Sequence, residues 1–271
     1  MAGSPWINFD RFTEADYEAL GASYRQALPF PHLVLDDLFP AAALRTIAED
    51  FNNLPSPDWR EFRTALQNRR ATVPGSHLPH TVQAYFNFLY SGPFLRFLSR
   101  ITGINNLIPD PDLHGGGMHE VSAGGRFEVH VDFVKHPCTG LTNRLAVITY
   151  LNEDWSVEDG GALELWELNP PRCRATVPPS FAKTVIMEQS ECAAHGHPSP
   201  VRDGRLRRSV IAYFYTAEAA RKTGSDMLAT TYVPHEDHSS QQRAELVLRR
   251  IMPRFVIKYL KAINQAVRAR R

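Results

Sequence analysis

The sequence predicts a mainly β protein with flanking helices, and three observations support this prediction. From about residue 103 to residue 217, short strand-like runs follow one another, separated by Gly, Pro, Asn and Asp. Between these runs the sequence shows no helix-length pattern, which argues against βαβ units and a parallel sheet. Helical patterns gather instead toward the two ends of the chain. The distribution favours a β-sandwich or jelly roll with helices beside it.

The N-terminal part, residues 1–102, is expected to supply helices and a lead-in strand. Thr13 followed by Asp16 is typical of a helix cap, so a helix is predicted over residues 13–27. The stretch "PFPHLVLDDLFP" indicates a short buried strand at residues 32–35, between prolines. Further helices are predicted over residues 41–54, 81–90 and 93–102.

Residues 55–79 interrupt this helical part with a polar and irregular stretch that contains "RTALQNRRATVPGSHLP". A long loop inside a compact domain is often functional. We hypothesise that residues 55–79 form a lid whose arginines, Arg63, Arg69 and Arg70, meet an anionic or polar substrate.

The strands of the predicted core lie in residues 103–217. The expected runs are "FEVHVDF", "RLAVITYLN", "GALELWEL", "ATVPPS", "KTVIME" and "RRSVIAYFYT". Residues 218–271 are expected to be helical again, with Ser239 as a cap. The three parts are interpreted as one compact domain, because no linker separates them.

Composition excludes several classes of partner. The 271 residues are 43% hydrophobic, and 30 Lys and Arg nearly balance 29 Asp and Glu, so no overall field draws the protein to nucleic acid or membrane. The basic C-terminal segment is interpreted as a solvated helix face. The three cysteines form no C-x-x-C pair, and neither a secretory signal nor an apolar run of about 20 residues is seen. We expect a cytoplasmic protein with reduced thiols.

The stretch "RFEVHVDF" alternates with a period of two, which predicts that Glu128, His130 and Asp132 share one strand face. Two histidines and one carboxylate on one face of an octahedron form the ligand set of non-haem iron(II) oxygenases. The second histidine must come from another strand. The stretch "ECAAHGHPSP" offers His195 and His197.

A basic residue on the strand "RRSVIAYFYT" has a matching role. Iron of this class usually needs a co-substrate such as 2-oxoglutarate, whose C5 carboxylate requires a cation. Arginine suits it, because its planar fork pairs with a carboxylate through two hydrogen bonds. Arg207 and Ser209 point the same way along the strand, whereas Arg208 has the opposite parity.

The ordered set "GGRFEVHVDF", "RLAVITYLNEDW", "GGALELW", "HGHPSP" and "RRSVIAYFYT" resembles the 2-oxoglutarate/Fe(II)-dependent dioxygenases, most closely the branch related to prolyl hydroxylases. The resemblance covers roughly residues 103–216, nearly half of the chain. It implies a double-stranded β-helix with helices packed on one side. It also implies Fe(II), 2-oxoglutarate and O₂ as cofactors, with ascorbate as a candidate reductant.

The resemblance also implies site residues. The iron ligands would be His130, Asp132 and His195, the last chosen over His197 because it comes first in "H-G-H-P". The co-substrate contacts would be Arg207, Ser209 and Tyr150 at the C5 carboxylate, with His119 on the preceding strand. Candidate contacts on the substrate side are Arg144, Trp166, Arg69 and Arg70. The segment "VPHEDHSSQ", with His235, Asp237 and His238, is interpreted as a loop at a helix start rather than a second metal site.

These residues predict an oxygenase that hydroxylates an unactivated C–H bond of a prolyl residue or free amino acid and releases succinate and CO₂. A natural-product or sugar substrate is the first alternative, and desaturation or cyclisation would use the same oxidant. A non-catalytic jelly-roll binding module with a residual metal site is the alternative of another class, and a zinc hydrolase on a cupin-like barrel is a third. Neither of the last two explains Arg207 beside the triad. Small molecules or peptides are the expected partners, and the oligomeric state stays open.

Overall fold

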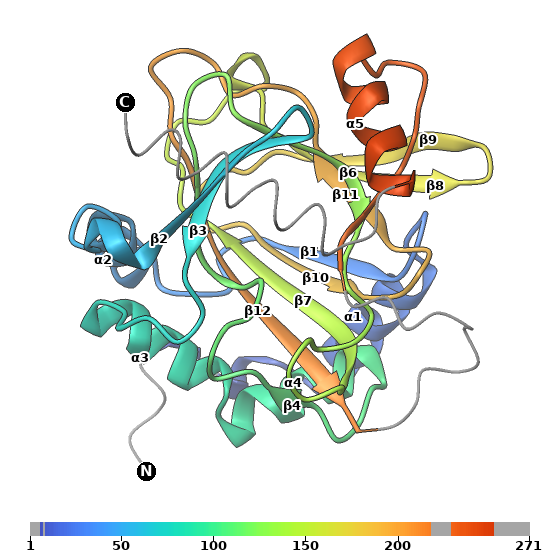
Figure 1. Cartoon of the computed structure of the whole chain (residues 1–271). Coiled ribbons are helices and arrows are strands. Elements are labelled where there is room, and N and C mark those ends of the chain that lie inside the picture. Colours follow the sequence, from blue (N-terminus) through green and yellow to red (C-terminus); the bar gives the residue numbers. More distant parts are fainter. Residues whose placement is uncertain (1–5, 8, 218–228, 252–271) are drawn as a thin grey trace.

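The structure, a computed structural model, describes residues 6–7, 9–217 and 229–251 (Figure 1). Thirteen strands form one curled sheet in the order β1-β10-β7-β12-β5-β3-β6-β11-β8-β9, with β2, β4 and β13 paired at its sides. The strands are β1 (His32–Leu35), β2 (Trp59–Arg63), β3 (Gln67–Thr72), β4 (Ile108–Pro109), β5 (Gly117–Val121), β6 (Arg126–Val131), β7 (Thr142–Tyr150), β8 (Leu163–Leu168), β9 (Pro171–Val177), β10 (Thr184–Glu188), β11 (Ala194–His197), β12 (Arg207–Thr216) and β13 (Thr231–Tyr232). The helices are α1 (Glu14–Gln26), α2 (Ala41–Asp50), α3 (His80–Leu89), α4 (Gly92–Thr102) and α5 (Ser240–Ile251), with 3-10 turns η1 (Phe9–Arg11), η2 (Ser56–Asp58) and η3 (Val157–Asp159).

The sheet curls into two facing layers. Strands β10, β7, β12 and β5 form one layer, and strands β6, β11, β8 and β9 form the other. Neighbouring strands in both layers are antiparallel. Strand β3 pairs with β5 and with β6 and so joins the two layers along one edge. This arrangement confirms the predicted fold class, a double-stranded β-helix with flanking helices.

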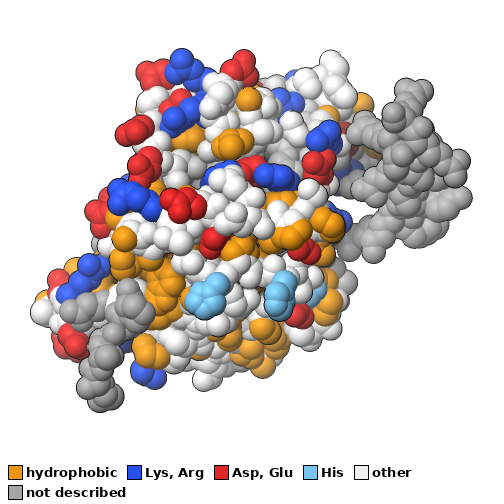
Figure 2. Space-filling view, turned by 90° about the vertical axis from the view of Figure 1, so that its left-hand side faces the viewer, with side chains coloured by type: hydrophobic (Ala, Val, Ile, Leu, Met, Phe, Trp, Pro, Cys, Tyr) orange, Lys and Arg blue, Asp and Glu red, His pale blue; other side chains and the backbone are white. Residues whose placement is uncertain are grey.

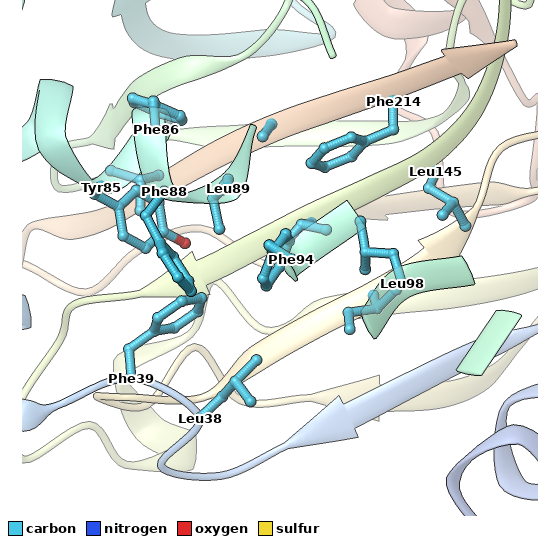
Figure 3. Packing of buried hydrophobic residues seen from close by; sticks show 14 of the residues in the cluster. Leu38, Phe39, Tyr85, Phe86, Phe88, Leu89, Phe94, Leu98, Leu145 and Phe214 are labelled. Atoms are coloured by element: carbon cyan, nitrogen blue, oxygen red, sulfur yellow. The ribbon is translucent and has the colours of Figure 1, made fainter. Parts of the chain in front are cut away.

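Helices α1 to α4 cover the outer face of the first layer. Along β7, Leu145 and Val147 belong to the core under the helices, whereas Ala146 and Ile148 belong to the barrel interior. Figure 3 shows aromatic side chains from the helical part, including Phe94, against the strand residues Leu145 and Phe214. Each fully buried side chain of this size contributes about 1.5–3 kcal/mol. One face of this layer is therefore filled by the helices, and the other face, toward the barrel interior, can hold a site.

The predicted helix over residues 13–27 is confirmed, together with its cap. The Asp16 backbone N–H donates to Thr13 Oγ1 at 3.2 Å, and the Thr13 N–H donates to Asp16 Oδ2 at 2.8 Å. These two bonds form a capping box, which satisfies two donors that the helix start would otherwise leave unpaired. The helices expected over residues 41–54, 81–90 and 93–102 and the strand at 32–35 are also present.

The segment 55–79 is not the irregular loop that its polarity predicted. It contains the hairpin β2–β3, and β3 is part of the core sheet. The hairpin is rich in arginine, but the arginine side chains lie over aromatic rings: Arg70 over Trp59 and Arg69 over Phe62, each at 4.4 Å. Arginine stems that cover apolar surface hide a strand from a hydropathy pattern.

The C-terminal part returns to the barrel before α5. Strand β13 pairs with β6, with Thr231 opposite Val131 and Tyr232 opposite His130. The expected cap is present, since the Gln242 N–H donates to Ser239 Oγ at 3.3 Å. The remainder of the expected 218–271 helical segment, residues 218–228 and 252–271, lies outside the described residues.

The described helices include none that is long and apolar enough to span a membrane. On the face where α2, β2 and α3 lie, basic and acidic side chains are interspersed (Figure 2). This mixture fits the small net charge of +1.

Candidate active site

A β-bulge in β6 sets the direction of the metal-ligand candidates. His195 lies opposite His130, but His197 lies opposite Phe127, so β6 has one more residue than β11 in this stretch. The extra residue shifts the alternation of inward and outward side chains along β6 by one position. Phe127, rather than Glu128, therefore shares the interior face with His130. The rings of Phe127 and His130 stack with their centroids 3.8 Å apart. The prediction that Glu128 lies on this face is wrong, because sequence alternation does not reveal a bulge.

Gly196 lies against the bulge. A Cβ atom at this position would lie 2.9 Å from Phe127 O, Glu128 O and the Val129 Cα. Backbone atoms surround that space, so a side chain there could not be accommodated by a rotamer change. The glycine in "H-G-H" allows the two ligand strands to approach each other.

We expect Gly196→Ala to lower the free energy of unfolding by about 1–3 kcal/mol, the usual cost of overpacking a core. Denaturant titration monitored by circular dichroism measures it. Gly92→Ala is the matched control, because the atoms nearest to that Cβ are the flexible end of Arg96. Equal stability of the Gly196 and Gly92 variants would contradict the close packing at the bulge.

Three ligand candidates converge inside the barrel. His130 Nε2 lies 3.5 Å from Asp132 Oδ1, and His195 Nε2 lies 3.5 Å from Asp132 Oδ2. The other ring nitrogens face backbone carbonyls: His130 Nδ1 lies 2.7 Å from Glu128 O, and His195 Nδ1 lies 2.9 Å from Ala193 O. A carbonyl only accepts, so each Nδ1 carries the proton. Each Nε2 lone pair is then directed at the common centre.

The electrostatics keep this triad in the form that binds metal. Burial would raise the pKa of Asp132, but the neighbouring His130 and His195 and the Tyr213 hydroxyl outweigh burial and leave the pKa well below its usual range. Tyr213 donates its hydroxyl to Asp132 Oδ2 at 2.7 Å. Burial lowers the pKa of His195 to about 4, against the opposing charge of Asp132. At neutral pH Asp132 is therefore a carboxylate and His195 is a neutral imidazole.

An anion-binding end of the cavity lies on β12. The Arg207 Nε donates to Gly161 O at 2.7 Å, and its NH2 lies 3.4 Å from the Tyr150 hydroxyl. Arg207 is 5% exposed and has no carboxylate partner among the described residues. Ser209 lies opposite Tyr150 on one side and His119 on the other. Its hydroxyl is buried and has no hydrogen-bond partner in the described part of the chain.

A second arginine, Arg69, is half-buried and faces the same cavity from β3. Its guanidinium lies between the rings of Phe62 and Phe127, at 4.4 and 4.3 Å. Its NH1 lies 3.2 Å from His119 Nδ1, and the other nitrogen of His119 lies 3.1 Å from Gly116 O. Burial and then the Arg69 charge lower the pKa of His119 to about 3, so this ring is neutral and accepts from Arg69.

One cavity brings these groups together. Its lining combines the ligand triad, the two arginines and apolar side chains. The lining includes Arg69, His119, Phe127, His130, Asp132, Phe133, Ile148, Tyr150, Leu163, His195, His197, Arg207, Ser209, Ile211, Tyr213 and Thr230. A metal triad, two cations and a mostly apolar wall can hold an anionic chelator beside a reactive metal.

Comparison with known proteins agrees with this arrangement. Residues 116–216 match the model of the 2OG-Fe(II) oxygenase superfamily. A prolyl 3-hydroxylase OGFOD1 from Xenopus laevis is 30% identical over 231 residues, which are 80% of this chain and 42% of that protein. Over these residues the chain is similar to the 2-oxoglutarate- and Fe(II)-dependent oxygenases. The predicted resemblance to prolyl hydroxylases is confirmed, although the chain spans only 42% of the length of the Xenopus relative.

Two solved structures show the same fold as this chain. A Trichoplax adhaerens prolyl hydroxylase in complex with a hypoxia inducible factor oxygen degradation domain peptide has a TM-score of 0.54 at 15% identity, and the match covers 74% of this chain and 91% of that one. The non-heme alpha ketoglutarate dependent carbocyclase SnoK from nogalamycin biosynthesis has a TM-score of 0.56 at 12% identity, over 93% and 95% of the two chains.

The cavity residues fit both groups in the name of the matched superfamily, 2-oxoglutarate and Fe(II). The ligand atoms of His130, Asp132 and His195 all lie within 4.8 Å of one another, a spacing that an ion about 2 Å from each atom can bridge. Two imidazoles and one carboxylate on one side of a cavity suit Fe(II). The buried Ser209 hydroxyl without a partner and the uncompensated Arg207 suit a carboxylate.

Some predicted contacts lie outside the cavity. Arg70 and Arg208 point to the other face of the sheet, where both bind Glu120. The parity that separated Arg208 from Arg207 is therefore confirmed, whereas Arg70 does not line the cavity.

Arg144 and Trp166 also miss the cavity lining. Arg144 lies six residues from Tyr150 along β7, about 20 Å at the usual rise per residue. Its charge acts on Glu188 and Tyr24 instead. Trp166 follows the interior residue Leu165, so its side chain faces outward and packs in a separate cluster with Val129 and Val131.

Sequence reasoning missed the roles of three cavity residues. Phe127 enters the interior because of the bulge. The strand pattern indicates that Tyr213 is core and barrel lining, but it gives no sign that the Tyr213 hydroxyl donates to Asp132. His197 is buried beside Arg207 and Arg69, and its Nδ1 has no hydrogen-bond partner within the described chain. Its position two residues after His195 was the available signal for an inward side chain.

Proposed function

We propose that this chain is an Fe(II)- and 2-oxoglutarate-dependent hydroxylase that acts on a C–H bond of a prolyl residue or a free amino acid. The observation that carries this proposal is the single cavity that holds His130, Asp132 and His195 together with the uncompensated Arg207. Prolyl hydroxylation is favoured over other substrates by the 30% identity to the Xenopus prolyl 3-hydroxylase.

The cofactors supply the oxidation: with both bound, O₂ puts one oxygen atom into the substrate C–H bond and the other into succinate as 2-oxoglutarate loses CO₂. The chain holds these groups in register. His130, Asp132 and His195 would bind the iron on one side and leave its other side open. The Arg207 guanidinium, with the Ser209 and Tyr150 hydroxyls, would bind the C5 carboxylate.

Other residues of the chain position these groups and exclude water. The hydroxyl of Tyr213 fixes the Asp132 carboxylate at 2.7 Å. The rings of Phe127 and Phe133 and the side chain of Leu163 line the cavity and reduce its solvent content. A dry site strengthens the ion pair between Arg207 and the co-substrate.

Arg69 is the candidate contact to a carboxylate or carbonyl of the substrate. We expect Arg69→Ala to raise the KM of the substrate, or of 2-oxoglutarate if it contacts that molecule, by about 10–100-fold, the effect of losing a hydrogen bond to a charged group. Steady-state kinetics with one reactant varied at a time measures it. Arg70→Ala is the control, since Arg70 binds Glu120 outside the cavity. Unchanged KM values for both reactants in Arg69→Ala would remove Arg69 from the binding site.

The substrate class is tested by mass spectrometry. Iron-loaded protein, 2-oxoglutarate and O₂ are incubated with prolyl peptides, free proline and other free amino acids, and each product is examined for one added oxygen atom. We expect added oxygen on a prolyl or amino-acid substrate, with succinate in equal amount. A sugar or natural-product intermediate as the only coupled substrate would overturn the substrate class and keep the oxygenase. No product and no succinate with any compound would favour the binding module.

A further inference from the structure

The bulge in β6 that places Phe127 inside the barrel turns Glu128 outward. There Glu128 meets two histidines of the segment between β13 and α5, His235 and His238. All three side chains are at most 6% exposed. The ring of His235 also packs against Trp166, with the ring centroids 5.0 Å apart. This cluster lies on the opposite face of β6 from the cavity.

The cluster has the spacing of a metal site. His235 Nε2 lies 3.6 Å and His238 Nε2 lies 3.5 Å from the same oxygen, Glu128 Oε2. The three ligand atoms all lie within 4.8 Å of one another. Around a tetrahedral zinc ion with bonds of about 2.0–2.1 Å, neighbouring ligand atoms lie about 3.3–3.4 Å apart. The two distances from Glu128 fit that geometry closely.

The ligand atoms themselves are free of hydrogen bonds. Both ring nitrogens of His235 and the Nε2 of His238 are buried without a hydrogen-bond partner among the described residues. A buried ring nitrogen without a hydrogen-bond partner costs free energy. Several such nitrogens around one carboxylate therefore indicate a bound ligand. The other carboxylate oxygen, Glu128 Oε1, accepts from Gln242 Nε2 at 2.6 Å and lies 3.2 Å from Arg126 Nε. These contacts hold the carboxylate with Oε2 directed at the histidines.

A comparable group, Asp110 with His114 and His136, shows this feature at one nitrogen, His114 Nδ1, which lies 3.4 Å from Asp110 Oδ2. His136 Nε2 lies 3.2 Å from Asp110 Oδ2, and its Nδ1 accepts from the backbone N–H groups of Cys138 and Thr139. Both nitrogens of His136 are thus engaged within the protein. Internal hydrogen bonds therefore engage one histidine of that group fully, whereas three ring nitrogens of His235 and His238 have no hydrogen-bond partner among the described residues.

We propose that Glu128, His235 and His238 form a second divalent-metal site, suited to Zn²⁺, which fastens the α5 segment to the outside of β6. Two imidazoles and one carboxylate favour zinc over calcium or magnesium, which prefer ligand sets made of oxygen. A water molecule would complete the tetrahedron. The site is independent of the proposed hydroxylation.

Helix α5 needs such a fastening, because it buries little apolar surface. Of residues 240–249, only Gln242 is buried, and Val247 and Leu248 are 56% and 47% exposed. The helix is held mainly by polar contacts, such as Glu245 Oε2, which accepts from the Ala65 N–H at 2.9 Å. The segment also carries Thr230 to the cavity lining. A metal ion at Glu128 would therefore hold one wall of the cavity in place.

The test uses the full chain, stripped of metal by a chelator, reloaded with Zn²⁺ and desalted. Elemental mass spectrometry measures the zinc bound per chain. The proteins compared are the wild type, Asp132→Ala, and two double variants that combine Asp132→Ala with His238→Ala or with Glu128→Gln. Because Asp132→Ala removes a ligand of the first triad, it isolates the second site. The matched control combines Asp132→Ala with His77→Ala, since His77 is exposed and belongs to neither cluster.

We expect about two zinc ions in the wild type, about one in Asp132→Ala and in the His77 control, and none in the two cluster variants. Zinc at 100 times its Kd should also raise the Tm of Asp132→Ala by about 5–10 °C. That rise should be absent in the cluster variants, whose folding is checked by circular dichroism; His238→Gln replaces His238→Ala if the latter does not fold. Asp132→Ala protein without bound zinc, or cluster variants that keep one zinc ion, would overturn the proposal.

Discussion

Asp132→Ala is expected to abolish iron binding and turnover together. The carboxylate lies 3.5 Å from the Nε2 atoms of both His130 and His195, so it is the ligand that links the two histidines. Loss of a group that merely supports a metal ligand costs about 10–100-fold in affinity or activity, so loss of a ligand should cost more than 100-fold. Fe(II) binding measured by anaerobic calorimetry and succinate release measured by chromatography check the two effects.

The fold should survive this change. Asp132 accepts one hydrogen bond, from Tyr213, and its removal leaves beside the cavity His195, whose pKa burial lowers to about 4. The matched control is Asp110→Ala, which alters a carboxylate beside two other histidines without touching the cavity lining. Turnover near the wild-type level in folded Asp132→Ala, or an equal loss in Asp110→Ala, would contradict the assignment of the metal centre.

Arg207→Ala is expected to raise the Kd of 2-oxoglutarate by about 10–150-fold, which corresponds to the loss of a hydrogen bond to a charged group. Arg207 is buried, and its guanidinium contacts only neutral groups, Gly161 O and the Tyr150 hydroxyl. An incoming carboxylate would therefore be its charge partner. Calorimetry of 2-oxoglutarate binding to the metal-loaded protein, without O₂, measures the change.

Two further variants distinguish charge from shape at this position. Arg207→Lys keeps the charge but not the planar fork, so its loss of affinity should be smaller than that of Arg207→Ala. Arg208→Ala removes the neighbouring arginine, which binds Glu120 on the other face, and should leave 2-oxoglutarate binding unchanged. An Arg207→Ala variant that binds 2-oxoglutarate like the wild type would show that another cation, such as Arg69, holds the C5 carboxylate.

Sequence periodicity predicted most of the helices and strands, because their side chains follow the regular helical and strand periods. The cap at Thr13 and the strand "RRSVIAYFYT" follow local rules, and the parity of that strand correctly separated Arg207 from Arg208. The pairing of one strand with another is not a local property, so alternation alone could not give the neighbours of Ser209.

The errors came from features that depend on contacts between distant segments. The bulge in β6 exists because Gly196 allows close approach, and it exchanges the faces of Phe127 and Glu128. The β2–β3 hairpin was missed because Arg69 and Arg70 cover aromatic rings that come from other positions. The sequence shows that Leu165 and Trp166 face opposite sides of their strand. It does not show which of the two sides faces the barrel interior.

The most direct test of the central claim is O₂-dependent conversion of 2-oxoglutarate to succinate by anaerobically iron-loaded protein, with Asp132→Ala beside it. The chain is expected to release succinate when O₂ is admitted, with a higher rate in the presence of its substrate and no release from the variant. If the wild type neither releases succinate nor binds 2-oxoglutarate in its iron-loaded form, the cavity is not that of a 2-oxoglutarate oxygenase.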